Sequence, residues 1–228
     1  MIAPSAKKTF FPEYPATDNK APHPARVDNI MTAKHFLAAF LGALAIFLSS
    51  FVFHMFTPLG EAGIDPLPGV DAVSGSLTAA IGDKPGMYMF PTGGLTADSP
   101  REQHAAAMEK IMEEIKTKPT GLLIYKPAGT PFNFGKNLAV EFGIDFLEAL
   151  LVVYLLSQTV LATFGRRVLF VTMAGVLAAI ATQPSLWNWY GFKGTYTLAN
   201  IVMEVAGFLC AGIVIALVTK NTPASQKA

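Results

Sequence analysis

Long apolar runs alternate with polar stretches along this chain. A run of about 20 apolar residues matches the hydrocarbon thickness of a bilayer when it forms a helix. The pattern therefore predicts a mainly α-helical protein, an integral membrane four-helix bundle. Its transmembrane helices are expected at residues 35–56, 138–164, 168–183 and 197–219. We interpret the first as an uncleaved anchor, because its apolar core is longer than that of a signal peptide and no small-x-small cleavage site follows it.

The region 57–137 has a different pattern, with frequent Gly and Pro, most of the acidic residues and apolar stretches too short to cross a bilayer. Gly86–Pro91 and Gly121–Pro127 read as strands, with a helix between them up to about Thr117. Strand, helix and strand suggest a β-α-β unit with parallel strands. We therefore expect a small extracytoplasmic α+β domain inserted after the first span. Its helix should pack through one apolar face, formed by Ala105, Met108, Met112 and Ile115.

The chain ends and the connections set the predicted topology. Residues 1–34 lack apolar periodicity and are predicted to be a disordered tail, and Met31 resembles a conventional start, so residues 1–30 could be an extension. Lys34, Arg166, Arg167 and Lys220 flank the spans at one end if there are four of them. Basic residues favour the cytoplasm, so both termini, including the tail 220–228, are predicted to be cytoplasmic.

An aromatic cluster follows Pro184, in a stretch read as an extracytoplasmic loop over 184–196. Trp187, Trp189 and Tyr190 are typical of the interfacial aromatic belt of a membrane protein. Stacking against a carbohydrate or a quinone is the alternative reading of these rings.

Composition supports the membrane reading. Of 228 residues, 52% are hydrophobic and 14% are charged, and the mean hydropathy is +0.42, which is too apolar for an ordinary soluble domain. The formal net charge of +1 gives no argument for a nucleic-acid partner. Cys210 is the single cysteine, so no intrachain disulfide is possible.

Three carboxylates interrupt the second predicted span. Glu141, Asp145 and Glu148 are spaced i, i+4 and i+7, so a helix presents them as one stripe. Ionisable residues inside a membrane are costly and usually face a bundle interior or a wet cavity.

Apart from Ser and Thr, the polar residues embedded within the other spans lie in the same outer half. His54 ends the first span, and Asn200 and Glu204 begin the fourth, while the inner halves are almost purely apolar. We expect Asp145 and Glu148 to meet Asn200 and Glu204 at a helix–helix contact. The six residues predict a ligand, proton or cation pocket that opens to the outside. The alternative is that the stripe faces the soluble domain or Lys136 and Lys193 and only fastens that domain.

So many carboxyl groups need a proton, a basic partner or a cation in a low-dielectric site. His54, Glu141, Asp145 and Glu204 could ligate a divalent cation, but no Glu-x-x-His pair indicates a di-iron bundle. The identity of any metal or cofactor stays unknown at this level.

Four sequence pieces together resemble bacterial four-span inner-membrane proteins of no assigned function: Pro85–Pro91, Gly121–Pro127, the Glu-Phe-x-x-Asp span and Trp187–Phe192. The resemblance covers roughly residues 36–220 and implies a bacterial inner-membrane setting but no activity. Protease, P-loop and haem-attachment motifs are absent from the sequence. We therefore expect a non-enzymatic accessory subunit with a protein partner or a second copy of itself. The alternatives are a component of a proton- or cation-coupled transporter and a metal-dependent membrane enzyme.

Overall fold

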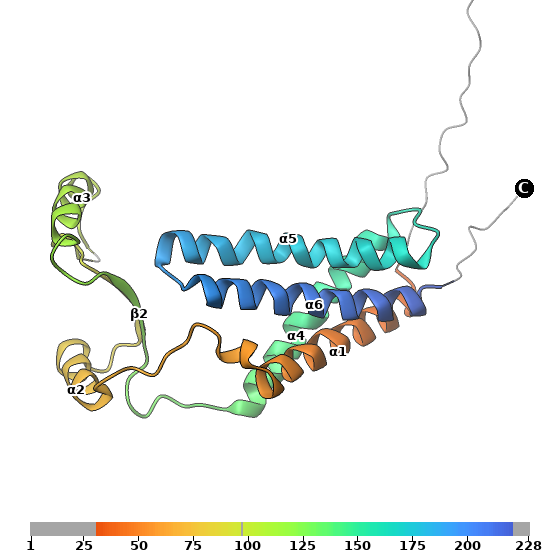
Figure 1. Ribbon diagram of the computed structural model, residues 1–228, viewed down its shortest axis with the longest axis horizontal. Coiled ribbons are helices and arrows are strands. Elements are labelled where there is room, and N and C mark those ends of the chain that lie inside the picture. The colour runs from red at the N-terminus through yellow and green to blue at the C-terminus, as the bar shows by residue number, and fades with distance from the viewer. Residues whose placement is uncertain (1–30, 97, 221–228) are drawn as a thin grey trace, which may run out of the picture. The chain divides into compact units, whose positions relative to one another are not determined.

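The computed structural model describes residues 31–96 and 98–220. Most of the predicted N-terminal tail and of the C-terminal tail lies outside these residues. Four long helices dominate the described part, with a smaller insertion between the first and the second of them (Figure 1). The long helices are α1 (Ala33–Phe56), α4 (Phe134–Ser157), α5 (Phe164–Tyr190) and α6 (Gly194–Val218).

Hydrogen bonds at the helix starts fix where these helices begin. The Thr32 backbone N–H donates to Nδ1 of His35 at 3.0 Å ahead of α1. The side chain of Asn133 accepts from the Lys136 N–H at 2.9 Å ahead of α4. Each bond satisfies an N–H group that the helix leaves free. Because Asn133 caps α4, the helix begins at Phe134, four residues before the predicted span.

Three of the long helices, α1, α5 and α6, are long and apolar enough to cross a membrane. The protein is therefore mainly helical, with three candidate membrane-spanning helices and a small two-stranded sheet. Large apolar side chains cover the outward surfaces of these helices, which suits contact with lipid. Examples that are roughly half exposed are Leu37, Phe40, Leu169, Met173, Val202 and Leu217.

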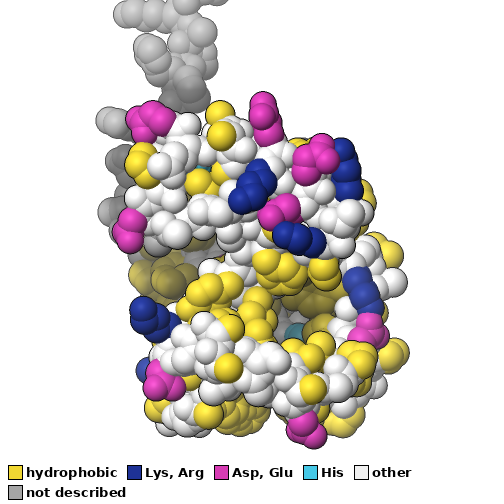
Figure 2. Space-filling view, turned by 90° about the vertical axis from the view of Figure 1, so that its left-hand side faces the viewer, with side chains coloured by type: hydrophobic (Ala, Val, Ile, Leu, Met, Phe, Trp, Pro, Cys, Tyr) yellow, Lys and Arg dark blue, Asp and Glu magenta, His cyan; other side chains and the backbone are white. Residues whose placement is uncertain are grey.

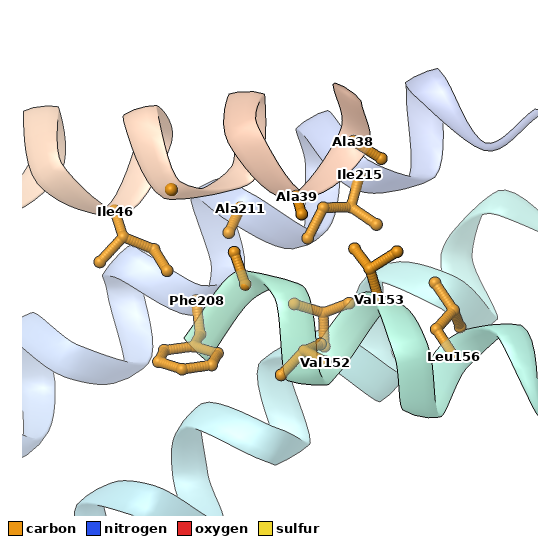
Figure 3. Close-up of a cluster of buried hydrophobic side chains, with 12 residues drawn as sticks. Ala38, Ala39, Ile46, Val152, Val153, Leu156, Phe208, Ala211 and Ile215 are labelled. Carbon is orange, nitrogen blue, oxygen red and sulfur yellow. The ribbon is translucent and has the colours of Figure 1, made fainter. Parts of the chain in front are cut away.

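Helix α1 packs against both α4 and α6, and α5 packs against α6. Small residues bring the helices together: a Cβ at Gly42 would lie 2.8 Å from Ile215 Cδ1, and a Cβ at Gly175 would lie 2.4 Å from Phe208 Cβ. Close backbone approach of this kind supplies the van der Waals contact that holds helices together in lipid. The buried cluster joins side chains of α1, α4, α5 and α6 (Figure 3).

The two ends of the four helices differ in their polar contacts. At one end Lys34 Nζ donates to the Lys220 carbonyl oxygen at 2.8 Å, and Arg167 Nη1 donates to the Thr219 carbonyl oxygen at 2.7 Å. We call the half of the helices nearer this end the basic half. The other half, nearer the insertion and the α5–α6 turn, is the insertion half.

The insertion contains η1 (Pro58–Glu61), α2 (Val70–Ile81), β1 (Gly86–Phe90), α3 (Gln103–Glu114) and β2 (Gly121–Tyr125). The strands are antiparallel, with Gly86 opposite Tyr125 and Phe90 opposite Gly121. The predicted parallel β-α-β unit is therefore wrong. The Tyr125 hydroxyl donates to the Gly82 carbonyl oxygen at 3.0 Å, which ties the end of β2 to the segment before β1. Helix α3 is part of a long loop between the strands and not a crossover.

The predicted inner face of α3 is also wrong. Ala107 is the buried residue of this helix, and a Cβ at Gly93 would lie 2.4 Å from the Ala107 carbonyl oxygen. Met108 and Met112 are 58% and 54% exposed. Gly93 has φ +61°, a conformation that glycine adopts without strain, and its turn covers the Ala107 face of the helix instead.

Pro184 does not end α5, in contrast to the predicted loop over 184–196. The helix runs on to Tyr190 and stops at Gly191, which has φ +74° and donates its N–H to the Leu186 carbonyl oxygen. Only residues 191–193 link α5 to α6. Trp187, Trp189 and Tyr190 are therefore exposed residues of the last turns of α5, where a place in the interfacial belt stays a prediction.

Candidate functional site: an acidic pocket between helices α1, α4 and α6

The insertion half contains a pocket of about 230 Å³. Side chains of α1, α4 and α6 line it, and the six residues predicted from the sequence are all among them: His54, Glu141, Asp145, Glu148, Asn200 and Glu204. The expected helix–helix contact between α4 and α6 takes another form. Both helices pack against α1 and face each other across the pocket.

Helix α4 supplies three of the carboxylates. Phe142, next to Glu141, holds this helix on α1, with its ring 5.7 Å from the Phe40 ring and 5.8 Å from the Phe47 ring, both edge to face. This anchor fixes the rotation of α4 and so turns the stripe toward the pocket. The stripe passes from the exposed Glu141 through the buried Asp145 to the half-buried Glu148.

Asp145 is the most enclosed acidic group of the pocket. It is 5% exposed, and its Oδ2 has no hydrogen-bond partner. A buried polar atom without a partner costs free energy, and a buried charge costs more unless something offsets it. The carboxylate oxygen therefore marks a place where a donor group is missing.

Helix α6 forms the opposite wall with Asn200, Glu204 and Gly207. The Asn200 amide donates to the Tyr196 carbonyl oxygen at 2.9 Å, which holds its side chain against its own helix. A Cβ at Gly207 would lie 3.3 Å from Ser49 Oγ, so α6 lies near α1 at this edge of the pocket.

Helix α1 closes the third side. The Ser49 hydroxyl donates to the Ile46 carbonyl oxygen at 2.8 Å, and Ser50 and His54 lie beside the pocket further along the helix. The turn η1 folds back onto His54, because a Cβ at Gly60 would lie 2.7 Å from His54 Nδ1. A side chain at position 60 would clash with the backbone of His54 as well as with its imidazole.

Ile46 and Phe208 line the pocket and also belong to the buried apolar cluster. They form its floor, where the polar space ends and the packed basic half begins. Figure 3 shows both side chains toward one end of the buried cluster, with Val152 and Ile215 further along it. Sequence reasoning did not single out either residue, because an apolar residue in an apolar helix gives no signal of where a cavity ends.

No Lys or Arg side chain lines this pocket. Among the described residues the ion pairs are Lys116–Glu113, Lys118–Glu114 and Lys193–Asp65, so none of the pocket carboxylates takes part in one. The carboxylates also repel one another: Glu141 and Glu148 act on Asp145, and Glu148 acts on Glu204 across the pocket. In the described residues neither Lys136 nor Lys193 forms an ion pair with the stripe. The fastening alternative therefore has no ion pair in its support.

The pocket is not a preformed metal centre. In the described ranges, no three His, Cys, Asp or Glu residues lie close enough together to hold a metal ion. The carboxylates belong to two helices, α4 and α6, and apolar side chains such as Ile144 and Met203 line the pocket with them. Trp187, Trp189 and Tyr190 do not line the pocket.

Two other buried polar atoms lack a partner among the described residues, Gln183 Oε1 on α5 and Thr197 Oγ1 on α6. Both lie in the insertion half, and neither residue lines the pocket.

No family model, no curated protein and no solved structure matches this chain.

Proposed function

We propose that the chain is a four-span protein of a bacterial inner membrane, with α4 as the fourth span. Helix α4 has 24 residues, as many as α1, and its buried side chains belong to the same apolar cluster as those of the other long helices. A face of α4 beside the carboxylate stripe is exposed and apolar, as expected for contact with lipid. That face consists of Val140, Leu147, Leu151 and Leu155, and Ile144 at its edge also lines the pocket.

The proposed orientation places the basic half toward the cytoplasm. Lys34, Arg166, Arg167 and Lys220 belong to the connections and helix ends on that side, and basic residues near span ends favour the cytoplasm. The insertion and the acidic pocket are then extracytoplasmic, and both termini are cytoplasmic.

We further propose that the protein is a non-enzymatic binding or accessory subunit that receives a positively charged group in the acidic pocket. The convergence of polar side chains from three helices on one pocket, above a floor of Ile46 and Phe208, carries this proposal. A transport path needs polar or wetting groups through the whole membrane thickness. The buried polar side chains of the described residues, Asp145 and Thr197, both belong to the insertion half.

Exposed apolar side chains of the insertion support a protein partner or a second copy of this chain. Met87 and Met89 on β1, Met108 and Met112 on α3, and Ile124 on β2 are each more than half exposed. Figure 2 shows hydrophobic side chains at the surface among separate acidic and basic ones. Exposed apolar surface on a folded domain commonly marks an interaction site.

A component of a proton- or cation-coupled transporter is the second candidate. The observation that favours it is the set of carboxylates without a basic partner, since such groups carry protons in pumps and transporters.

Cysteine labelling tests the topology. In a Cys210→Ser background, a membrane-impermeant maleimide applied to intact spheroplasts should modify Ser76→Cys in the insertion and should leave Gln158→Cys, in the α4–α5 connection, unmodified. Both positions are exposed, and permeabilised cells, in which both should react, give the control. Labelling of both sites in intact spheroplasts would mean that α4 does not cross the membrane.

Proteoliposomes test the function. We expect no flux of protons, Na⁺ or K⁺ beyond that of empty vesicles. A flux that is present in the wild type and disappears in Glu148→Gln would establish the transporter alternative and overturn the accessory proposal.

A further inference from the structure

We propose that the acidic pocket binds an aliphatic diamine or polyamine, a flexible chain with ammonium groups separated by methylene carbons. This inference rests on the proposed function and names the class of ligand.

The placement of the charges gives the first reason. Carboxylates stand on both walls, Asp145 and Glu148 on α4 and Glu204 on α6, and each repels a neighbour without any paired cation. Several separated negative charges are offset best by several separated positive charges. A ligand with a single charge would leave part of the repulsion in place.

A buried hydrogen-bond acceptor without a donor gives the second reason. Asp145 Oδ2 is buried and has no donor, although the residue lines the pocket. A protonated amine carries two or three N–H donors and can serve a carboxylate oxygen and a further acceptor at once. Hydrogen bonds between ionised partners are the stronger kind. A quaternary ammonium has no N–H to donate and would leave the oxygen unsatisfied.

The third reason is the apolar lining between the charges. Ile144 and Met203 lie among the carboxylates, and Ile46 and Phe208 form the floor. Methylene groups between two ammonium centres can cover these side chains while the charged ends reach opposite walls. A bare metal ion needs several oxygen ligands around one point, and no such group of residues occurs in the described part of the chain.

Size supports the same class. Pockets for drug-sized ligands range from about 300 to 1,000 Å³, and this pocket of about 230 Å³ is smaller. A slender aliphatic chain suits the space better than a ringed or branched molecule.

Titration of the purified full-length protein in mild detergent tests the inference, with spermidine and 1,4-diaminobutane as probes. Both should bind and raise the melting temperature, because a ligand that binds only the folded state stabilises it. Asp145→Asn and Glu204→Gln should each weaken spermidine binding by at least tenfold. Asp71→Asn, which removes an exposed carboxylate of α2 outside the pocket, is the matched control and should leave the affinity unchanged. Two pocket variants on different helices guard against loss of one through misfolding.

Four results would overturn the inference. Butylamine binding as tightly as 1,4-diaminobutane would mean that the pocket recognises one ammonium group, as a lysine of a partner protein would present it. Mg²⁺ or tetramethylammonium giving the same stabilisation at matched ionic strength would indicate a general charge effect. An unchanged affinity in both pocket variants would place the amine site elsewhere. An absence of amine binding would reject the ligand class. None of these results would alter the labelling pattern or the flux measurement, so the proposed function is judged separately.

Discussion

The basic half and the insertion half of the four helices differ in the kinds of side chain that they enclose. In the basic half, small and branched apolar residues pack closely, and Ala38, Ala39, Val153 and Ile215 are almost fully buried. In the insertion half the helices leave a pocket lined by charged and polar groups. All three of the unpartnered buried side-chain atoms found in the described residues belong to the insertion half, on Asp145, Gln183 and Thr197.

This difference shows where the stability of the helix assembly comes from. Lipid tails are as apolar as leucine, so helices in a bilayer associate through close packing rather than through the hydrophobic effect. The basic half supplies that packing. It allows the insertion half to hold carboxylates that repel one another, an arrangement that costs stability. Polar substitutions should therefore have opposite consequences in the two halves.

The largest expected effect is that of an amide placed in the basic half. Val153 is 1% exposed, and Val153→Asn would bury a polar group without a partner at a cost of roughly 2–4 kcal/mol. The matched variant Asp145→Asn lies on the same helix and introduces the same side chain. It removes a charge that other carboxylates repel, so its stability should equal or exceed that of the wild type.

Thermal unfolding in detergent, without added amine, measures both variants. A melting temperature that falls in Asp145→Asn as far as in Val153→Asn would show that Asp145 fastens the helices, and the contrast between the two halves would fail.

A second pair of variants compares the packed interface with the edge of the pocket. A Cβ at Gly175 would lie 2.4 Å from Phe208 Cβ and 2.5 Å from its Cγ, so Gly175→Ala forces α5 and α6 apart at a cost of about 2–3 kcal/mol. A Cβ at Gly207 would lie 3.3 Å from Ser49 Oγ and 3.6 Å from Ile46 Cγ2. Gly207→Ala gains helix propensity and should remain within about 0.5 kcal/mol of the wild type.

The same melting experiment ranks these two variants, and gel filtration in detergent reports whether either aggregates. Equal destabilisation by both would mean that the pocket edge is packed as tightly as the α5–α6 interface.

Local sequence patterns were sufficient to predict that polar residues of α1, α4 and α6 come together in one pocket. The spacing of Glu141, Asp145 and Glu148 depends only on helical periodicity, and the depth of Asn200 and Glu204 in their span follows from counting residues. Helix rotation decides whether such stripes face each other. That rotation is set by contacts such as Phe142 between Phe40 and Phe47, which a sequence pattern does not reveal.

The errors have two origins. Pro184 usually marks the end of a helix, but α5 continues through it to Gly191. In the insertion, the antiparallel pairing of the strands and the exposed side of α3 accompany contacts between residues distant in sequence, Tyr125 with Gly82 and Gly93 with Ala107. Propensity and periodicity carry no information about such contacts.

The smallest expected effects compare the polar contacts at the two ends of the helices. Arg167 is half-buried in the basic half, where its Nε donates to the Leu161 carbonyl oxygen at 2.8 Å and its Nη1 to that of Thr219 at 2.7 Å. Because these bonds satisfy carbonyl groups of the α4–α5 connection and of the end of α6, Arg167→Gln should cost about 1–2 kcal/mol. Lys193 pairs with Asp65 at the other end, and both side chains are more than half exposed, so Lys193→Gln should cost about 0.5 kcal/mol or less. Unfolding at low and at high salt separates the two, since salt screens an exposed ion pair and has less influence on a half-buried one. If Lys193→Gln proved the more damaging and its effect persisted at high salt, the insertion end would hold a stabilising contact as strong as those of the basic end, and the division between a packed half and a binding half would have to be abandoned.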